Sequence, residues 1–184
     1  MNKSVLEKSL NGSGHDADPE DLGVERLLDR LETGLREEIA QRGMENPAMI
    51  GIQTGGAWVA EKLCARLGLR EALGLLNISF YRDDFSQAGM HPRVGPSQLP
   101  FRVEGRHILL IDDVLYTGRT IRAALNEIFD YGRPAQVVLG VLIERNGRQI
   151  PVQADRIGGR IQLAPDQRIK LTGPDPLRLM IRSI

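Results

Sequence analysis

The chain has 184 residues, 41% of them hydrophobic and 26% charged, which is typical of a single globular domain with a sizeable core. Its 24 Lys and Arg residues balance 24 Asp and Glu residues, which argues against a nucleic-acid binder held by bulk charge but leaves room for a local basic face. No apolar run approaches the roughly 18 residues of a membrane span, and the polar start lacks the apolar core of a signal peptide, so we expect a cytoplasmic protein.

The first elements are predicted from periodicity and turn residues. Residues 1–20, with a Gly-Ser-Gly stretch and an acidic run, predict a flexible tail ahead of a single domain at 21–184. Apolar residues from Val24 to Arg42 follow helical spacing, and Gly43 ends this helix. The run "AMIGI" (48–52) predicts a short buried strand.

A tight turn at Thr54-Gly55-Gly56 then leads into a predicted helix at 57–68. That helix contains Trp58, which we expect to pack, and Cys64, which we expect to be a small core residue. Because Cys64 is the single cysteine, the chain has no intramolecular disulfide and no cysteine-based zinc cluster.

The rest of the chain alternates strands and helices. Residues 82–100 have little periodicity and predict a long loop, a kind of segment that is usually functional or disordered. We expect strands at 73–81, 107–111 and 135–143, a helix at 119–131, and short strands at 155–161, 167–171 and 177–184. This order predicts an α/β fold with a mostly parallel sheet flanked by helices and a small added lobe.

Two adjacent carboxylates, Asp112 and Asp113, follow the predicted strand at 107–111. Ligands of parallel sheets bind beyond the carboxyl ends of the strands, and at such an end the turning chain lets both side chains address one ligand. Sugar hydroxyls and a hard cation such as Mg²⁺ are the partners that suit a carboxylate pair. An Asx-type cap at a strand–turn–helix junction is the simpler alternative, but it explains one aspartate and not two.

The segment from Leu115 to Thr120 predicts a phosphate cradle. Gly118 lets the backbone approach a ligand, the following helix offers unpaired N–H groups, and Thr117 and Thr120 add hydroxyls. The segment contains neither a Walker A pattern nor a dinucleotide fingerprint. Carboxylates for a diol directly before this cradle indicate a site for a ribose 5-phosphate.

The string "ILLIDDVLYTGRT" resembles the 5-phosphoribosyl 1-diphosphate (PRPP) motif of the type I phosphoribosyltransferases. Together with "GIQTGGAWVAEKL", "SFYRDDF" and the residues that follow the motif, it resembles the PyrR family over about residues 25 to 182. Members of that family are bifunctional pyrimidine operon regulators and uracil phosphoribosyltransferases. The resemblance implies the type I phosphoribosyltransferase fold with a small hood lobe, and transfer of the ribosyl 5-phosphate of PRPP to uracil, giving UMP and pyrophosphate.

The resemblance also implies roles in PRPP binding. Asp112 and Asp113 would hold the ribose 2′- and 3′-hydroxyls and contact Mg²⁺ directly or through water. The 5′-phosphate and adjoining ribose would be bound by Val114, Leu115, Tyr116, Thr117, Gly118, Arg119 and Thr120. The turn at Thr54, Gly55 and Gly56 would bind pyrophosphate through backbone amides; typical members have Thr-Arg-Gly here, so this chain lacks the arginine. A plain tight turn is the alternative.

The long predicted loop would close over the reacting centre in this superfamily. Arg82 would neutralise the leaving pyrophosphate, and Asp83 and Asp84 would assist the metal or fix Arg82. The alternative is that these charges merely keep an exposed loop soluble.

For the base, the resemblance points to "VLIERNGR" and "DRIGGRI", with Glu144, Arg145, Arg156 and Ile157 as candidates. Purine-salvage relatives have a lysine near the position of Glu144 that donates to the purine 6-oxo group, so an acid there disfavours purines. Ile157 would cover one face of a pyrimidine, and Arg156, where an aromatic residue is common, would stack on the base. Core packing is the alternative for Ile157.

Two other functions are weighed against the uracil enzyme. One is an RNA-binding attenuator of pyrimidine-operon mRNA with little or no enzyme activity, and the other is a purine phosphoribosyltransferase, which Glu144 disfavours. Scattered surface charges are the alternative to an RNA-binding face. The candidate RNA contacts are basic residues of the second half of the chain: Arg133, Arg145, Arg148, Arg160 and Lys170. The resemblance further implies a homodimer or a higher even-numbered homo-oligomer.

Overall fold

The computed structural model describes residues 23–78 and 96–183. The expected tail at 1–20 and the candidate residues Arg82 and Asp83 lie outside the described residues. The helices are α1 (Val24–Gln41), α2 (Gly55–Leu67) and α3 (Arg119–Tyr131). The strands are β1 (Ala48–Ile52), β2 (Gly74–Leu76), β3 (His107–Leu115), β4 (Gln136–Arg145), β5 (Arg156–Ile161), β6 (Gln167–Thr172) and β7 (Arg178–Ser183).

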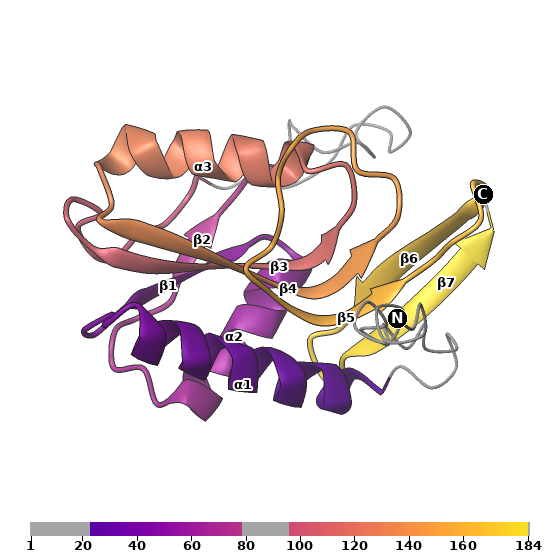
Figure 1. Cartoon of the computed structure of the whole chain (residues 1–184), viewed down its shortest axis with the longest axis horizontal. Helices are drawn as coiled ribbons and strands as arrows, with labels where there is room; N and C mark the ends of the chain where they lie inside the picture. The colour runs from indigo at the N-terminus through magenta and orange to yellow at the C-terminus, as the bar shows by residue number, and fades with distance from the viewer. Residues whose placement is uncertain (1–22, 79–95, 184) are drawn as a thin grey trace, which may run out of the picture.

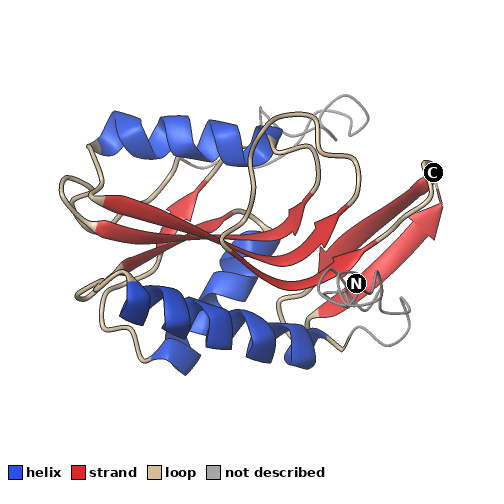
Figure 2. Cartoon of the chain, viewed as in Figure 1, coloured by secondary structure: helices blue, strands red, loops and turns tan. Residues whose placement is uncertain are grey.

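A five-stranded parallel sheet in the order β2-β1-β3-β4-β5 forms the centre of the domain. Helices α1 and α2 cover one face of this sheet and α3 covers the other (Figures 1 and 2). Alternate residues of β3 enter different cores: Leu109 and Ile111 pack with the α1–α2 layer, whereas Ile108 and Leu110 pack with α3. The expected α/β fold with a parallel sheet is confirmed. Burial of β3 on both faces explains why its residues 108–111 are all apolar.

The chain reverses its direction of winding between β1 and β3. From β1 it passes through α2 to β2 on one side, and from β3 it passes through α3 to β4 on the other. The loops at the carboxyl ends of β1 and β3 therefore diverge from a common point, and such a switch point opens a crevice in parallel α/β sheets.

The small lobe expected at the end of the chain is an antiparallel hairpin of β6 and β7. It lies beyond the carboxyl ends of the central strands (Figure 1) and contacts β3 through β6. Its inner face packs against the α1–α2 core through Ile169, Leu171, Leu179 and Ile181.

Several element bounds differ from the expectation. Strand β3 continues to Leu115 instead of ending at Ile111, because Asp112, Val114 and Leu115 remain paired with β4. Strand β2 contains only residues 74–76 of the strand expected at 73–81. Helix α2 begins at Gly55, since both glycines of the expected turn adopt the helical conformation of its first turn.

Other expectations are confirmed. Helix α3 has the expected bounds, and Gly43 follows α1 with a φ of 58°. The side chain of Cys64 is half-buried, its Sγ lies 3.4 Å from Met49 Sδ, and burial raises the pKa of its thiol to about 11. Among the described residues, no helix combines the length and apolarity needed to cross a membrane.

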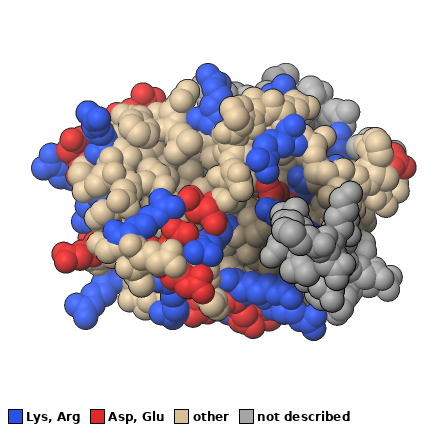
Figure 3. All heavy atoms as spheres, in the orientation of Figure 1, with Lys and Arg blue, Asp and Glu red and all other residues tan. Residues whose placement is uncertain are grey.

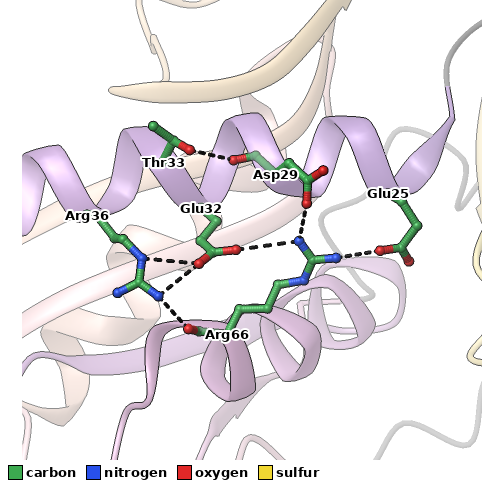
Figure 4. Close-up of polar contacts among 6 residues, drawn as sticks. All are labelled: Glu25, Asp29, Glu32, Thr33, Arg36 and Arg66. Carbon is green, nitrogen blue, oxygen red and sulfur yellow. Dashed lines mark hydrogen bonds and ion pairs between the residues drawn. The ribbon is translucent and has the colours of Figure 1, made fainter.

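Helix α2, which begins at the switch point, is tied to α1 by the guanidinium groups of Arg66 and Arg36 (Figure 4). Arg66 Nη1 lies 2.6 Å from Asp29 Oδ1 and 3.5 Å from Glu32 Oε2, and its Nη2 pairs with Glu25. Arg36 extends this network, because its Nη2 donates to Glu32 Oε1 at 2.8 Å and to the Arg66 carbonyl at 2.5 Å. The hydrogen bond with Asp29 contributes most to raising the pKa of Arg66.

We expect Arg66→Ala to lower the free energy of unfolding by about 1 kcal/mol, because it leaves three carboxylates of α1 without their shared cation. Urea unfolding of the variant at low salt and at about 1 M salt measures the loss, which screening should reduce. Arg30→Ala is the matched control, since Arg30 is an exposed arginine of α1 outside this network. Equal losses in the two variants would contradict the prediction.

Candidate functional site

The two adjacent carboxylates lie near the carboxyl end of β3, at the switch point. Asp112 is buried, with 1% of its surface exposed, and Asp113 is half-buried. The Asp113 backbone N–H donates to Asp112 Oδ1 at 3.0 Å. Both residues lie against the first turn of α2, so the continued strand still brings them to one place.

The glycine pair of α2 makes this close approach possible. A Cβ at position 55 would lie 2.3 Å from Asp113 Oδ2. A Cβ at position 56 would lie 2.7 Å from the Ile111 carbonyl oxygen and 2.9 Å from Asp112 Cα. Because neither position carries a side chain, the N-terminal backbone amides of α2 and its positive dipole end lie beside the carboxylates.

The predicted phosphate cradle forms the loop between β3 and α3. Gly118 is the N-cap of α3 with a φ of 91°, a conformation that favours glycine. Thr117 is buried, and its Oγ1 accepts the Arg119 backbone N–H at 3.2 Å. The loop therefore presents the N-terminus of a helix on the opposite side of the carboxylates from Gly55.

A second loop supports this cradle, and sequence reasoning missed it. The Thr117 carbonyl accepts the N–H groups of Gln149 at 3.1 Å and Ile150 at 3.2 Å. The side chains of Ile150 and Val152 pack against Gly118. The only signal in the sequence was Asn146-Gly147, a pair that favours a turn after β4 but does not say what the turn packs against.

Tyr116 is held between the two loops. The Arg145 guanidinium carbon lies 4.2 Å from the centre of the Tyr116 ring, a cation–π contact. Gly147 has a φ of 106°, and a Cβ there would lie 2.4 Å from Tyr116 Cε2. The expected base-site residue Arg145 thus packs on the cradle, and its Nη1 also donates to the Gln167 carbonyl at 3.1 Å.

Glu144 is a buried acceptor at the carboxyl end of β4. Only 7% of its surface is exposed. Its carboxylate accepts Arg148 Nη2 at 2.5 Å and Arg160 Nε at 2.7 Å. Two arginines therefore satisfy this acid, and a buried carboxylate with such partners is tolerated.

The structure separates Arg156 from Ile157. Ile157 packs with the α3 core, and Val141 pairs with it on one side and with Asp112 on the other. The Arg156 side chain turns to the other face of the sheet, where its Nε donates to Glu38 at 2.9 Å and its Nη1 lies 3.3 Å from Glu37. The expectation that Arg156 stacks on a base is corrected, because α1 binds its guanidinium.

The candidate RNA contacts fall into distinct surroundings. Arg145 lies on Tyr116, whereas Arg148 and Arg160 pair with Glu144. Arg133 is exposed after α3, and Lys170 is exposed on β6. Only Arg148 and Arg160 are shown to share a partner, the Glu144 carboxylate.

The carboxylate pair supplies oxygen ligands of the kind that Mg²⁺ prefers. Within residues 23–78 and 96–183, no group of three His, Cys, Asp or Glu side chains is arranged to hold a metal ion. A pair of carboxylates that shares a cation with the phosphates of a substrate does not need a third protein ligand, so the residues present fit Mg²⁺.

Comparison with known proteins identifies the family of this chain. The phosphoribosyl transferase domain family matches residues 23–169. The bifunctional protein PyrR of Nitrosococcus oceani is 58% identical over 168 residues, which are 90% of this chain and 95% of the relative. The bifunctional protein PyrR of Pseudomonas aeruginosa is 56% identical over 153 residues, covering 83% of this chain and 90% of the relative.

Solved structures support the fold. The hypoxanthine phosphoribosyltransferase from Trypanosoma cruzi in complex with the product IMP aligns with a TM-score of 0.57 at 22% identity, over 77% of this chain and 78% of that chain. A purine phosphoribosyltransferase from Pyrococcus horikoshii aligns with a TM-score of 0.56 at 22% identity, over 76% and 86%. At this identity the likeness concerns the fold alone.

The two glycines of α2 should respond differently to substitution. We expect Gly56→Ala to lower the free energy of unfolding by about 1–3 kcal/mol, because the new methyl group meets the backbone of β3. Gly55→Ala should cost less, since its methyl group meets the Asp113 side chain, which can rotate away. Urea unfolding of both variants compares the losses, and a Gly56→Ala protein as stable as the wild type would show that α2 can move away from β3.

Proposed function

Because the chain belongs to the PyrR family of phosphoribosyltransferase-domain proteins, we propose that it transfers the ribosyl 5-phosphate group of PRPP to uracil. The reaction gives UMP and pyrophosphate. A second activity, UMP- or PRPP-responsive regulation of pyrimidine genes through their mRNA, belongs to the same proposal.

One observation supports the transferase most directly. Asp113 lies against Gly55 at the start of α2, and the Thr117-Gly118 cradle follows directly after β3, the strand that carries Asp113. Two helix N-termini thus flank a carboxylate pair, which suits a ligand with phosphate at both ends and a diol between them. PRPP has this arrangement of groups.

The proposed chemistry breaks the bond between C1′ and the pyrophosphate oxygen and forms a bond between C1′ and uracil N1, which loses its proton. Positive charge develops on the ribose and negative charge on the leaving group. Asp112 and Asp113 hold the hydroxyls of the ribose, and the amides of Thr54, Gly55 and Gly56 stabilise the pyrophosphate. Such a reaction depends on positioning and electrostatics and needs no protein nucleophile.

Mg²⁺ would be held by Asp112 and Asp113 together with substrate oxygens, and when bound it supplies positive charge for the departing pyrophosphate. Arg82 and Asp83 complete the proposed pyrophosphate site, although they lie outside the described residues. The Thr-Gly-Gly turn lacks the arginine of typical members. Pyrophosphate would therefore be bound at this turn by backbone amides.

The base end of the site favours a pyrimidine. Asp112 and Ile157 flank Val141 in the sheet register, so their Cα atoms are about 10 Å apart across two strand spacings. Ile157 would then cover a base whose ribose lies at Asp112. Glu144 has no proton donor to offer a purine 6-oxo group, because its carboxylate accepts from Arg148 and Arg160.

Incubation with PRPP, Mg²⁺ and each free base in turn tests the transferase. We expect UMP to form from uracil and to stop when EDTA removes Mg²⁺. Turnover of guanine or hypoxanthine without turnover of uracil would refute the uracil assignment.

Asp113→Asn should lower turnover roughly a hundredfold, since it removes the charge that faces the ribose. Urea unfolding should show little loss of stability, and Asp130→Asn, on the exposed side of α3, is the matched control. Near-normal turnover in Asp113→Asn would contradict the ribose role.

A further inference from the structure

Arg145, the last residue of β4, is the one buried cation among residues 23–78 and 96–183. Only 9% of its surface is exposed, whereas every other Lys or Arg in these ranges is half-buried or exposed. Arginine is almost never buried to this degree without a partner, because a charge removed from water must be compensated. Its surroundings should therefore contain a negative charge.

Within the described part of the chain, however, Arg145 forms no ion pair with an acid. Its guanidinium contacts neutral groups instead. Nη1 donates to the Gln167 carbonyl at 3.1 Å, Nε donates to the Asn146 carbonyl at 3.3 Å, and the centre of the Tyr116 ring lies 4.2 Å from the guanidinium carbon. Carbonyl dipoles and an aromatic face stabilise a cation but leave its net charge in place.

Other charges withdrawn from water are compensated. Cations and acids lie interspersed on the face of the molecule shown in Figure 3. The buried acid Glu144 accepts hydrogen bonds from two arginines. The half-buried cations of the described residues each pair with an acid: Lys62, Arg66, Arg106 and Arg156. Arg145 is therefore the exception, a buried positive charge without an acidic partner.

Anchoring of the neighbouring chain does not explain this charge. Asn146 already ties the end of β4 to the segment before β6 with a neutral amide. Its Nδ2 donates to the Leu163 carbonyl at 3.1 Å, and its Oδ1 accepts the Leu163 N–H at 2.9 Å. A neutral donor at position 145 would serve the Gln167 carbonyl in the same way. The positive charge therefore indicates an anion that binds next to it.

The cradle is the place for such an anion. Tyr116, whose ring Arg145 contacts, directly precedes Thr117 and Gly118 at the N-terminus of α3. The 5′-phosphate of PRPP or UMP, which the proposed function places on this cradle, carries close to two negative charges at neutral pH. Arg145 adds a full positive charge to the partial charge of the helix N-terminus, and burial protects its field from screening by salt.

We propose that Arg145 is a positioning residue for the phosphate end of the nucleotide, which fixes Tyr116 against the cradle and supplies the counter-charge of the 5′-phosphate. The inference rests on the proposed transferase function. It moves Arg145 from the base end of the site, where the resemblance puts it, to the phosphate end. The free-energy cost of burying the guanidinium is then offset when the phosphate binds.

The test measures binding of UMP to the full-length protein by calorimetry at about pH 7.5 and about pH 5.2, on either side of the second pKa of the phosphate. The ligand is mainly a dianion at the higher pH and a monoanion at the lower one. Arg145→Met keeps an apolar stem against Tyr116 and removes the charge, and Arg145→Lys keeps the charge. Arg178→Met, which removes an exposed arginine of β7, is the matched control.

We expect Arg145→Met to bind UMP about tenfold more weakly at the higher pH and about threefold more weakly at the lower pH, because a monoanion feels half of the Coulomb attraction. Arg145→Lys should retain most of the affinity, and the control should retain all of it. In turnover assays, Arg145→Met should raise the KM for PRPP and leave kcat within about twofold, since the 5′-phosphate is bound alike in the substrate and the transition state.

Several results would overturn the proposal. Equal losses of UMP affinity in Arg145→Met and Arg145→Lys, or the same loss at both pH values, would show that Arg145 only supports the loop. An Arg145→Met protein that fails to fold would show the same. Wild-type affinity in Arg145→Met would refute the role of Arg145 and leave the transferase standing, whereas no binding of UMP by the wild-type protein would count against the transferase as well.

Discussion

The contact between the first turn of α2 and the carboxyl end of β3 determines the geometry of the candidate site. A side chain at position 56 would meet the β3 backbone, and a side chain at position 55 would require the Asp113 carboxylate to move aside. With glycine at both positions, the helix N-terminus and the carboxylate pair share one small volume. Positive dipole and negative side chains then balance each other, which offsets the repulsion between two adjacent acids.

The apolar pattern of the sequence was enough to predict most of the elements. Helix α3 and the alternation of strands and helices followed from periodicity, and the carboxylates and cradle could be placed at a strand end from their order alone. The bounds of β3 could not be predicted, because Asp112 and Asp113 look like the end of a strand. The ladder with β4 continues through them, since backbone pairing does not depend on the charge of the side chain.

Partners distant in sequence were beyond prediction. Arg156 is adjacent to Ile157, but the pleat sends it to the opposite face, where Glu38 lies 118 positions away in the chain. In the sequence, Arg148 and Arg160 resemble scattered surface charges. In the structure, β5 places Arg160 beside Glu144. Arg156 pairs with both Glu37 and Glu38, and Arg160 shares Glu144 with Arg148; the position of β5 in the sheet brings Arg156 and Arg160 to these acids.

The loop from Asn146 to Val152 has a consequence for protein engineering. Connections after the strands of such sheets usually tolerate insertions, because they lie on the surface and hold nothing else in place. Here Gln149 and Ile150 hydrogen-bond the cradle and Gly147 fits against Tyr116, so a change in loop length would move the cradle as well. The hairpin turn at 173–176, which is exposed throughout, is the better place for a tag or a fluorescent label.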